Sequence, residues 1–137
     1  RMSNLYGPTP LRRFDLIHVL IRQLLAEGRG EVWSTAPARD FIHAEDAAEA
    51  VLELLETDYC GTVNLGTGTL TSVRQIVDWL AALSGCPIRE LGRPVAGPLR
   101  FQCDMTTLGR LLRWRPRLSA EDGVRRTWEA MKAWHAP

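Results

Sequence analysis

Short β-rich segments alternate with amphipathic helical segments along nearly the whole chain. Segments with strand character lie at residues 2–6, 31–35, 40–43, 62–65 and 88–91. Regular alternation of strands and helices favours a layered arrangement in which helices pack on mostly parallel strands. The sequence therefore predicts an α/β fold. Because the strands are few and short for the number of helices, we expect an incomplete sheet.

The helical segments carry clear start and stop signals. Residues 14–27 place apolar side chains on one helical stripe, with Gly28 at the end. Ser72 followed by Gln75 forms a capping box for the next clear stripe, which ends before Gly85. Further helices are predicted at residues 45 to about 57, at 104–114 and from 119 onward. We expect Asp104 to cap the second of these. The sequence thus predicts about five helices.

The composition excludes several classes of protein. With 45% hydrophobic and 24% charged residues in 137, the chain suits one globular domain. It contains neither an apolar run long enough to span a membrane nor a signal-peptide pattern, so we expect a cytoplasmic protein without membrane contact. Its 17 basic and 16 acidic residues are interspersed, which argues against nucleic acid as a partner.

The cysteines and histidines indicate no metal site. Cys60, Cys86 and Cys103 are odd in number, widely spaced and without a CxxC pair. We expect them to be buried free thiols. The three histidines lack ligand spacing, and His43 is predicted to pack beside the Arg39 strand rather than act as a base.

Four segments in a fixed order carry more specific information. They are RMSNLYGP, ARDFIHAEDAAEAV, VNLGTGTLTSVRQIV and, after an Arg-Pro pair, CDMTTLGRLLRWRPRLSAEDGVRRTWE. Together they resemble the C-terminal half of the extended short-chain dehydrogenase/reductase family, whose members are NAD(P)-dependent epimerases and dehydratases of nucleotide sugars. The resemblance covers residues 1–134. It implies a substrate-binding lobe with short strands and helices, and a full-length enzyme that uses NAD or NADP.

Two motifs of that family are missing from this sequence. There is no glycine-rich loop of a Rossmann βαβ unit, and neither Tyr6 nor Tyr59 has a Lys four residues later. The chain also opens on an apolar strand, which normally needs a neighbour on each side. We therefore expect residues 1–137 to be the C-terminal substrate-binding portion of a longer enzyme. The shortening would be natural, proteolytic or engineered. The segments 2–6 and 62–65 would belong to the edge of the absent Rossmann sheet.

The resemblance also implies substrate-binding residues. Asn4 would donate its amide to the substrate pyrophosphate, and Arg39 of the Arg-Asp-Phe motif would bind phosphate or ribose. Arg93 before Pro94 would clamp the pyrophosphate from another loop, with Arg100 as a second candidate, and we expect one of these two to be functional. Guanidinium and amide donors suit a diphosphate. Alternatively, Asn4 caps the turn that follows its strand.

Trp33 lies where the sequence departs from the family pattern. The usual strand and Gly-x-Gly turn are replaced by VWSTAPARDF, which has no glycine and places Pro37 two residues before Arg39. Losing glycine implies a differently shaped loop. We hypothesise that the Trp33 indole stacks on the nucleobase or closes its pocket. Asp40 is expected to orient Arg39 or the neighbouring backbone.

Two functions follow as expectations. In the first, the chain is the nucleotide-sugar-binding part of an NAD(P)-dependent epimerase, dehydratase or reductase. The absent half would then bind most of the cofactor and supply the catalytic groups, so that this part alone is inactive. It would pair with that half or self-associate through exposed strands. In the second, the chain is a non-catalytic module that binds a sugar nucleotide or pairs with another subunit.

Overall fold

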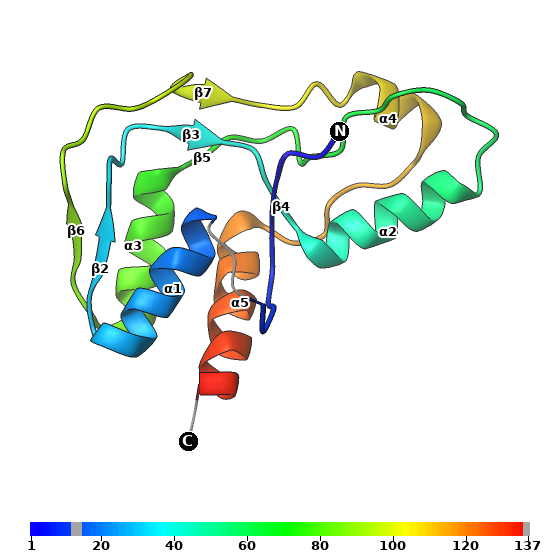
Figure 1. Ribbon diagram of the computed structural model, residues 1–137. Coiled ribbons are helices and arrows are strands. Elements are labelled where there is room, and N and C mark those ends of the chain that lie inside the picture. The colour runs from blue at the N-terminus through cyan, green and yellow to red at the C-terminus, as the bar shows by residue number, and fades with distance from the viewer. Residues whose placement is uncertain (12–14, 136–137) are drawn as a thin grey trace.

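The computed structural model describes residues 1–11 and 15–135. Within these ranges it contains five helices, shown in Figure 1. They are α1 (Leu16–Glu27), α2 (Ala44–Leu55), α3 (Val73–Ser84), α4 (Thr106–Leu111) and α5 (Ala120–His135). The strands are β1 (Asn4–Tyr6), β2 (Gly30–Val32), β3 (Ala38–Arg39), β4 (Phe41–His43), β5 (Thr71–Ser72), β6 (Ile88–Glu90) and β7 (Arg100–Phe101). The α/β prediction with about five helices is confirmed.

The helices begin and end where the side chains allow it. At α3, the Ser72 hydroxyl accepts from the Gln75 amide while the Gln75 side chain accepts from the Ser72 amide, which confirms the capping box. Helix α1 begins at Leu16 because the Asp15 carboxylate accepts from the amide of His18 at 3.2 Å. The predicted start at Phe14 lies outside the described residues. Asp104 accepts from the first helical amide of α4, at Thr106, over 2.9 Å.

The strands form three small sheets within the described residues. β1 pairs with β4 and β2 with β6, both in parallel. β3 pairs with β7 in parallel and with β5 antiparallel. The predicted strand at 62–65 is reduced to a single bridge between Met2 and Leu65, while the first strand pairs with β4 from Asn4 onward. The sequence predicts one incomplete sheet, and the described residues form three small ones.

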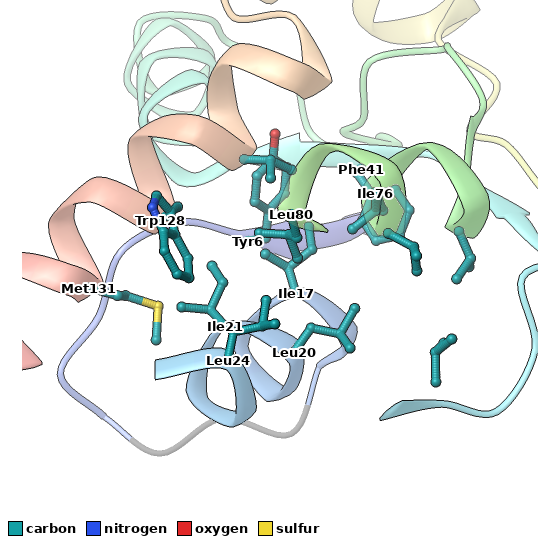
Figure 2. Close-up of a cluster of buried hydrophobic side chains, with 14 residues drawn as sticks. Tyr6, Ile17, Leu20, Ile21, Leu24, Phe41, Ile76, Leu80, Trp128 and Met131 are labelled. Atoms are coloured by element: carbon teal, nitrogen blue, oxygen red, sulfur yellow. The ribbon is translucent and has the colours of Figure 1, made fainter. Parts of the chain in front are cut away.

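The largest core cluster lies between α1, α3 and α5 and the strands β1, β2 and β4. Figure 2 shows the α1 side chains Ile17, Leu20, Ile21 and Leu24 facing Ile76 and Leu80 of α3 and Trp128 and Met131 of α5. On β4, Phe41 joins this cluster while its neighbour Ile42 enters a second cluster with α2 and α4, because adjacent strand side chains point to opposite faces. The strand β4 thus connects the two halves of the core.

Helix α5 approaches β1 closely at a glycine. A Cβ placed on Gly123 would lie 2.1 Å from the Tyr6 hydroxyl oxygen, so only glycine fits this contact. The Tyr6 hydroxyl donates to the carbonyl of Ala120 at 3.2 Å, in the first turn of α5. Tyr6 is therefore a packing residue that fixes the helix against the sheet.

Other predictions concern the cysteines and the membrane. Cys60 is exposed in the segment after α2, contrary to the expected burial, because this segment lies at the surface between two elements. Among the described residues, no group of His, Cys, Asp or Glu side chains could hold a metal ion. No helix in the described ranges has the length and apolarity that crossing a membrane requires.

Candidate functional site

A cavity of about 760 Å³ lies between α1, the β2–β6 sheet and the ends of β1 and β3. The α1 wall has apolar side chains in the middle, with Asp15 and Gln23 toward the helix ends. The opposite wall is formed by residues 31–34 and 91–96. Its size is typical of a small-molecule site.

Four of the five predicted binding residues line this cavity. They are Asn4 from β1, Trp33 and Arg39 from the two sides of one turn, and Arg93 from the segment after β6, and the fold brings them to one hollow. Arg100 does not line it and lies in the exposed strand β7. Of the two candidate clamp arginines, the structure therefore places only Arg93 at the cavity.

Backbone carbonyls hold the Arg39 guanidinium in place. Its Nη1 donates to the carbonyl of Ala38 at 3.0 Å and to that of Leu99 at 2.9 Å. The remaining N–H donors, on Nε and Nη2, make no hydrogen bond among the described residues. The side chain is thus oriented while keeping donors for a ligand.

Asp40 directly follows Arg39 and is fully buried. Its carboxylate accepts from the amides of Thr67 at 2.8 Å, Gly68 at 2.9 Å and Cys103 at 3.2 Å, and from the Thr67 hydroxyl at 2.8 Å. A Cβ on Gly66 would lie only 2.6 Å from one Asp40 oxygen. Asp40 therefore organises neighbouring backbone, which is one of the two roles predicted for it.

The glycine-containing loop at Gly66–Gly68 follows Leu65 and precedes α3, a place where a phosphate-binding loop could form. The amides of Thr67 and Gly68 already donate to Asp40. A phosphate cradle needs such amides to be free. The loop is a structural turn.

Asn4 holds the first strand to the fourth. Its side-chain Nδ2 and its backbone amide both donate to the carbonyl of Asp40, each at 3.0 Å. The alternative role, capping the turn after Tyr6, is wrong, because the partner lies across the sheet and not in the turn. One Nδ2 hydrogen remains available toward the cavity that Asn4 lines.

Trp33 and Arg93 form a pair at the exposed side of the cavity. The guanidinium carbon of Arg93 lies 5.3 Å from the centroid of the Trp33 ring, a cation–π contact. The backbone amide of Arg93 donates to the carbonyl of Trp33 at 2.9 Å. Trp33 is 61% exposed, so its ring remains accessible to a planar ligand group.

Tyr6 and His43 are buried titratable residues whose pKa values are shifted. Burial raises the pKa of the Tyr6 phenol above its usual range. Burial lowers the pKa of His43, whose Nδ1 accepts from the amide of Glu45 at 3.3 Å. His43 is the buried N-cap of α2, as the packing prediction implied.

Sequence reasoning missed the polar groups on the α1 wall and on β2. Asp15 and Gln23 line the cavity together with Glu31, and Gln23 accepts from the amide of Glu31 at 2.9 Å. Asp15, Val19 and Gln23 follow one another at intervals of four residues, so they share a helix face beside the apolar stripe. That spacing is a signal that could have identified them.

Comparisons with known proteins place the chain in a family. The model of the NAD dependent epimerase/dehydratase family matches residues 1–66. A relative, the putative GDP-L-fucose synthase 2 of Oryza sativa subsp. japonica, is 37% identical over 136 residues, which cover 89% of this chain and 38% of the relative. The chain belongs to the extended short-chain dehydrogenase/reductase family of NAD-dependent epimerases and dehydratases. It spans less than half the length of this relative.

Solved structures show the same fold. An NAD-dependent NDP-hexosamine 5,6-dehydratase of tunicamycin biosynthesis superposes with a TM-score of 0.87 at 24% identity, covering 97% of this chain and 44% of that one. The UDP-glucuronic acid 4-epimerase of Bacillus cereus, solved with UDP-glucuronic acid and NAD, gives a TM-score of 0.84 at 25% identity, with 98% and 44% covered. The fold of this chain is therefore that of part of an epimerase/dehydratase.

Proposed function

We propose that the chain is the nucleotide-sugar-binding part of an NAD(P)-dependent epimerase, dehydratase or reductase. One observation carries the proposal: two arginines, an asparagine and a tryptophan from three segments far apart in the sequence line one cavity. A diphosphate has about two negative charges, which planar guanidinium groups match with paired N–H donors. The relative's name as a GDP-L-fucose synthase supports a nucleoside-diphosphate sugar as ligand.

Each lining residue has a role in this proposal. Arg39 and Arg93 bind the diphosphate from opposite walls, and the free Nδ2 hydrogen of Asn4 supplies a neutral donor between them. Trp33 offers its exposed ring face to the nucleobase. The contribution of these residues is to bind and orient the substrate, because the phenol of Tyr6 and the imidazole of His43 are buried in packing roles.

In this proposal the described residues supply no dinucleotide site. In the loop at residues 66–68, the amides of Thr67 and Gly68 donate hydrogen bonds to Asp40, and the sequence has no Tyr-x-x-x-Lys pair. NAD or NADP, which would accept a hydride from a sugar carbon, is thus assigned to another part of the whole enzyme.

Residues 1–137 form the substrate-binding portion in this proposal, and the first strand adjoins the sheet of the cofactor-binding portion. A second hollow, of about 490 Å³, supports this placement. It is lined by Arg1, Met2, Val51, Leu54, Gly61, Thr62, Val63 and Leu65. Its mostly apolar walls and the 52% exposure of Met2 suit coverage by another part of the enzyme.

The proposal is tested by nucleotide binding in the natural polypeptide that carries this chain. A thermal-shift panel of GDP, UDP, dTDP and CDP sugars should show stabilisation by at least one of them, because a ligand of the folded state raises the melting temperature. Arg39→Ala should weaken the affinity for that ligand about tenfold or more, since it removes charge-assisted hydrogen bonds.

Arg100→Ala is the matched control, because Arg100 lies in the strand that pairs with Arg39's own strand but outside the cavity. We expect its affinity to stay within about twofold of the unaltered protein. Absence of stabilisation by every nucleotide, or equal losses for both variants, would refute the proposed function.

A further inference from the structure

Glu90 of β6 holds the turn that follows β2. Its Oε1 accepts from the backbone amide of Thr35 at 2.7 Å, and its Oε2 accepts from the Thr35 hydroxyl at 2.8 Å. One carboxylate thus binds both the backbone and the side chain of a single turn residue. These two bonds lower the pKa of Glu90, so the group is a carboxylate at neutral pH.

Arg74 of α3 completes the arrangement. Its Nη2 donates to Glu90 Oε2 at 2.9 Å and to the Thr35 hydroxyl oxygen at 2.8 Å. The three side chains form a closed triangle, which we name the Thr35–Arg74–Glu90 clasp. An exposed ion pair by itself adds little stability, but here each member comes from a different element and the backbone is anchored as well. The clasp therefore fixes position more than it adds stability.

The clasped turn joins two parts of the cavity lining, one that carries Trp33 and one that carries Arg39. Figure 1 shows the chain passing from β2, beside β6, to β3, beside β5 and β7. Trp33 lies two residues before Thr35, on the β2–β6 side with Arg93, and Arg39 lies four residues after it. The turn thus connects Trp33 to Arg39 and constrains how far apart these two lining residues lie.

The turn has no glycine to define its shape. Residues 33–37 are Trp-Ser-Thr-Ala-Pro, and no non-glycine residue of the described chain has a positive φ. No residue of the turn therefore has a left-handed backbone conformation that would fix the path of the chain. Besides the clasp, the Pro37 carbonyl accepts from the amide of Val73 at the start of α3, at 2.8 Å, which ties the other end of the turn.

We propose that Glu90, through the Thr35–Arg74–Glu90 clasp, is a positioning residue that holds the Trp33 indole over the cavity and so sets its affinity for a nucleoside diphosphate. Glu90 does not line the cavity and acts only through the turn. The inference rests on the proposed function of the cavity.

The test measures the affinity for GDP, UDP, dTDP and CDP by calorimetry in the natural polypeptide, and the variants are compared on the nucleotide that binds most tightly. Glu90→Gln and Thr35→Val should each weaken binding about tenfold, because each breaks a charge-assisted bond of the clasp. Glu45→Gln is the control: it removes a Glu–Arg pair of 3.0 Å between α2 and α5, far from the clasp in the fold. It should bind like the unaltered protein.

The distinguishing measurement is a double-mutant cycle with Trp33→Ala. If Glu90 acts by positioning Trp33, then Glu90→Gln should change affinity less than about twofold once Trp33 is gone, while its effect on the melting temperature stays the same. An unchanged tenfold effect in that background would show a merely structural role and overturn the inference. So would a Trp33→Ala variant with unaltered affinity. If the unaltered protein binds none of the four nucleotides, the proposed function itself fails.

Discussion

At the scale of single residues, His43 shows how a polar group serves the core. It is 2% exposed, its ring meets the Tyr6 ring edge-on at 5.4 Å, and its Nδ1 caps α2. Burial is the main reason that its pKa is lowered, with Arg126 acting in the same direction against Glu45 and Asp46. The cap requires the neutral ring, because a protonated Nδ1 cannot accept a hydrogen bond.

The cap formed by His43 should make the free energy of unfolding depend on pH. Since the folded-state pKa of His43 lies below the unfolded value of about 6.5, its contribution to stability is complete above that value and is lost as the pH falls through the folded pKa. Urea unfolding between about pH 8 and pH 5 should show a smaller loss of stability for His43→Asn, which keeps an accepting group at the cap, than for the unaltered protein. Parallel curves for the two proteins would contradict the assignment.

At the scale of elements, the contact between α5 and β1 depends on one glycine. Gly123→Ala introduces a methyl group 2.1 Å from the Tyr6 hydroxyl oxygen. We expect a loss of about 2 kcal/mol in the free energy of unfolding, because this overpacking outweighs the better helix propensity of alanine. Chemical denaturation measures it, and Tyr6→Phe in the same background should restore part of the loss.

Gly109 of α4 provides the matched control. A Cβ at this helical glycine would meet nothing within 4 Å. Gly109→Ala should therefore be neutral or stabilising by up to about 1 kcal/mol. Equal destabilisation at both glycines would mean that the Tyr6 contact does not control the first effect.

At the scale of the whole molecule, apolar side chains remain exposed around α2. Leu52 and Leu55 are 65% and 76% exposed. Met2 and Tyr59 are also exposed, at 52% and 43%. Contiguous apolar surface on an isolated domain favours association. The short first strand is also paired on each side over only part of its length, since Ser3 bonds to Leu65 and Asn4 to Asp40.

We therefore predict that residues 1–137, expressed alone, self-associate. Size-exclusion chromatography with light scattering should show a mass above that of one chain, increasing with concentration. Replacing Leu52 and Leu55 by Lys should reduce the association, because the charges disfavour burial of this helix face. A monodisperse monomer at all concentrations would show that the exposed side chains need no partner.

The sequence by itself predicted the helices and the family, and it indicated candidate residues that line the cavity. The Ser72–Gln75 capping box and the glycines after α1 and α3 act over a few residues. The helix ends that they define can therefore be predicted from the sequence alone. The ordered motifs likewise indicated Asn4, Arg39 and Arg93, which line one cavity.

Only the tertiary structure decided what depends on the path of the chain. The strands β3, β5 and β7 have two residues each and exist through pairings across about 30 to 60 residues, which local patterns do not encode. The fold also decided that Arg93 lines the cavity and Arg100 does not. The role of Glu90 likewise depends on distant residues, because its partners Thr35 and Arg74 are 55 and 16 residues away in the sequence. Capping and periodicity are local interactions, whereas a clasp or a cavity wall forms only when distant segments meet.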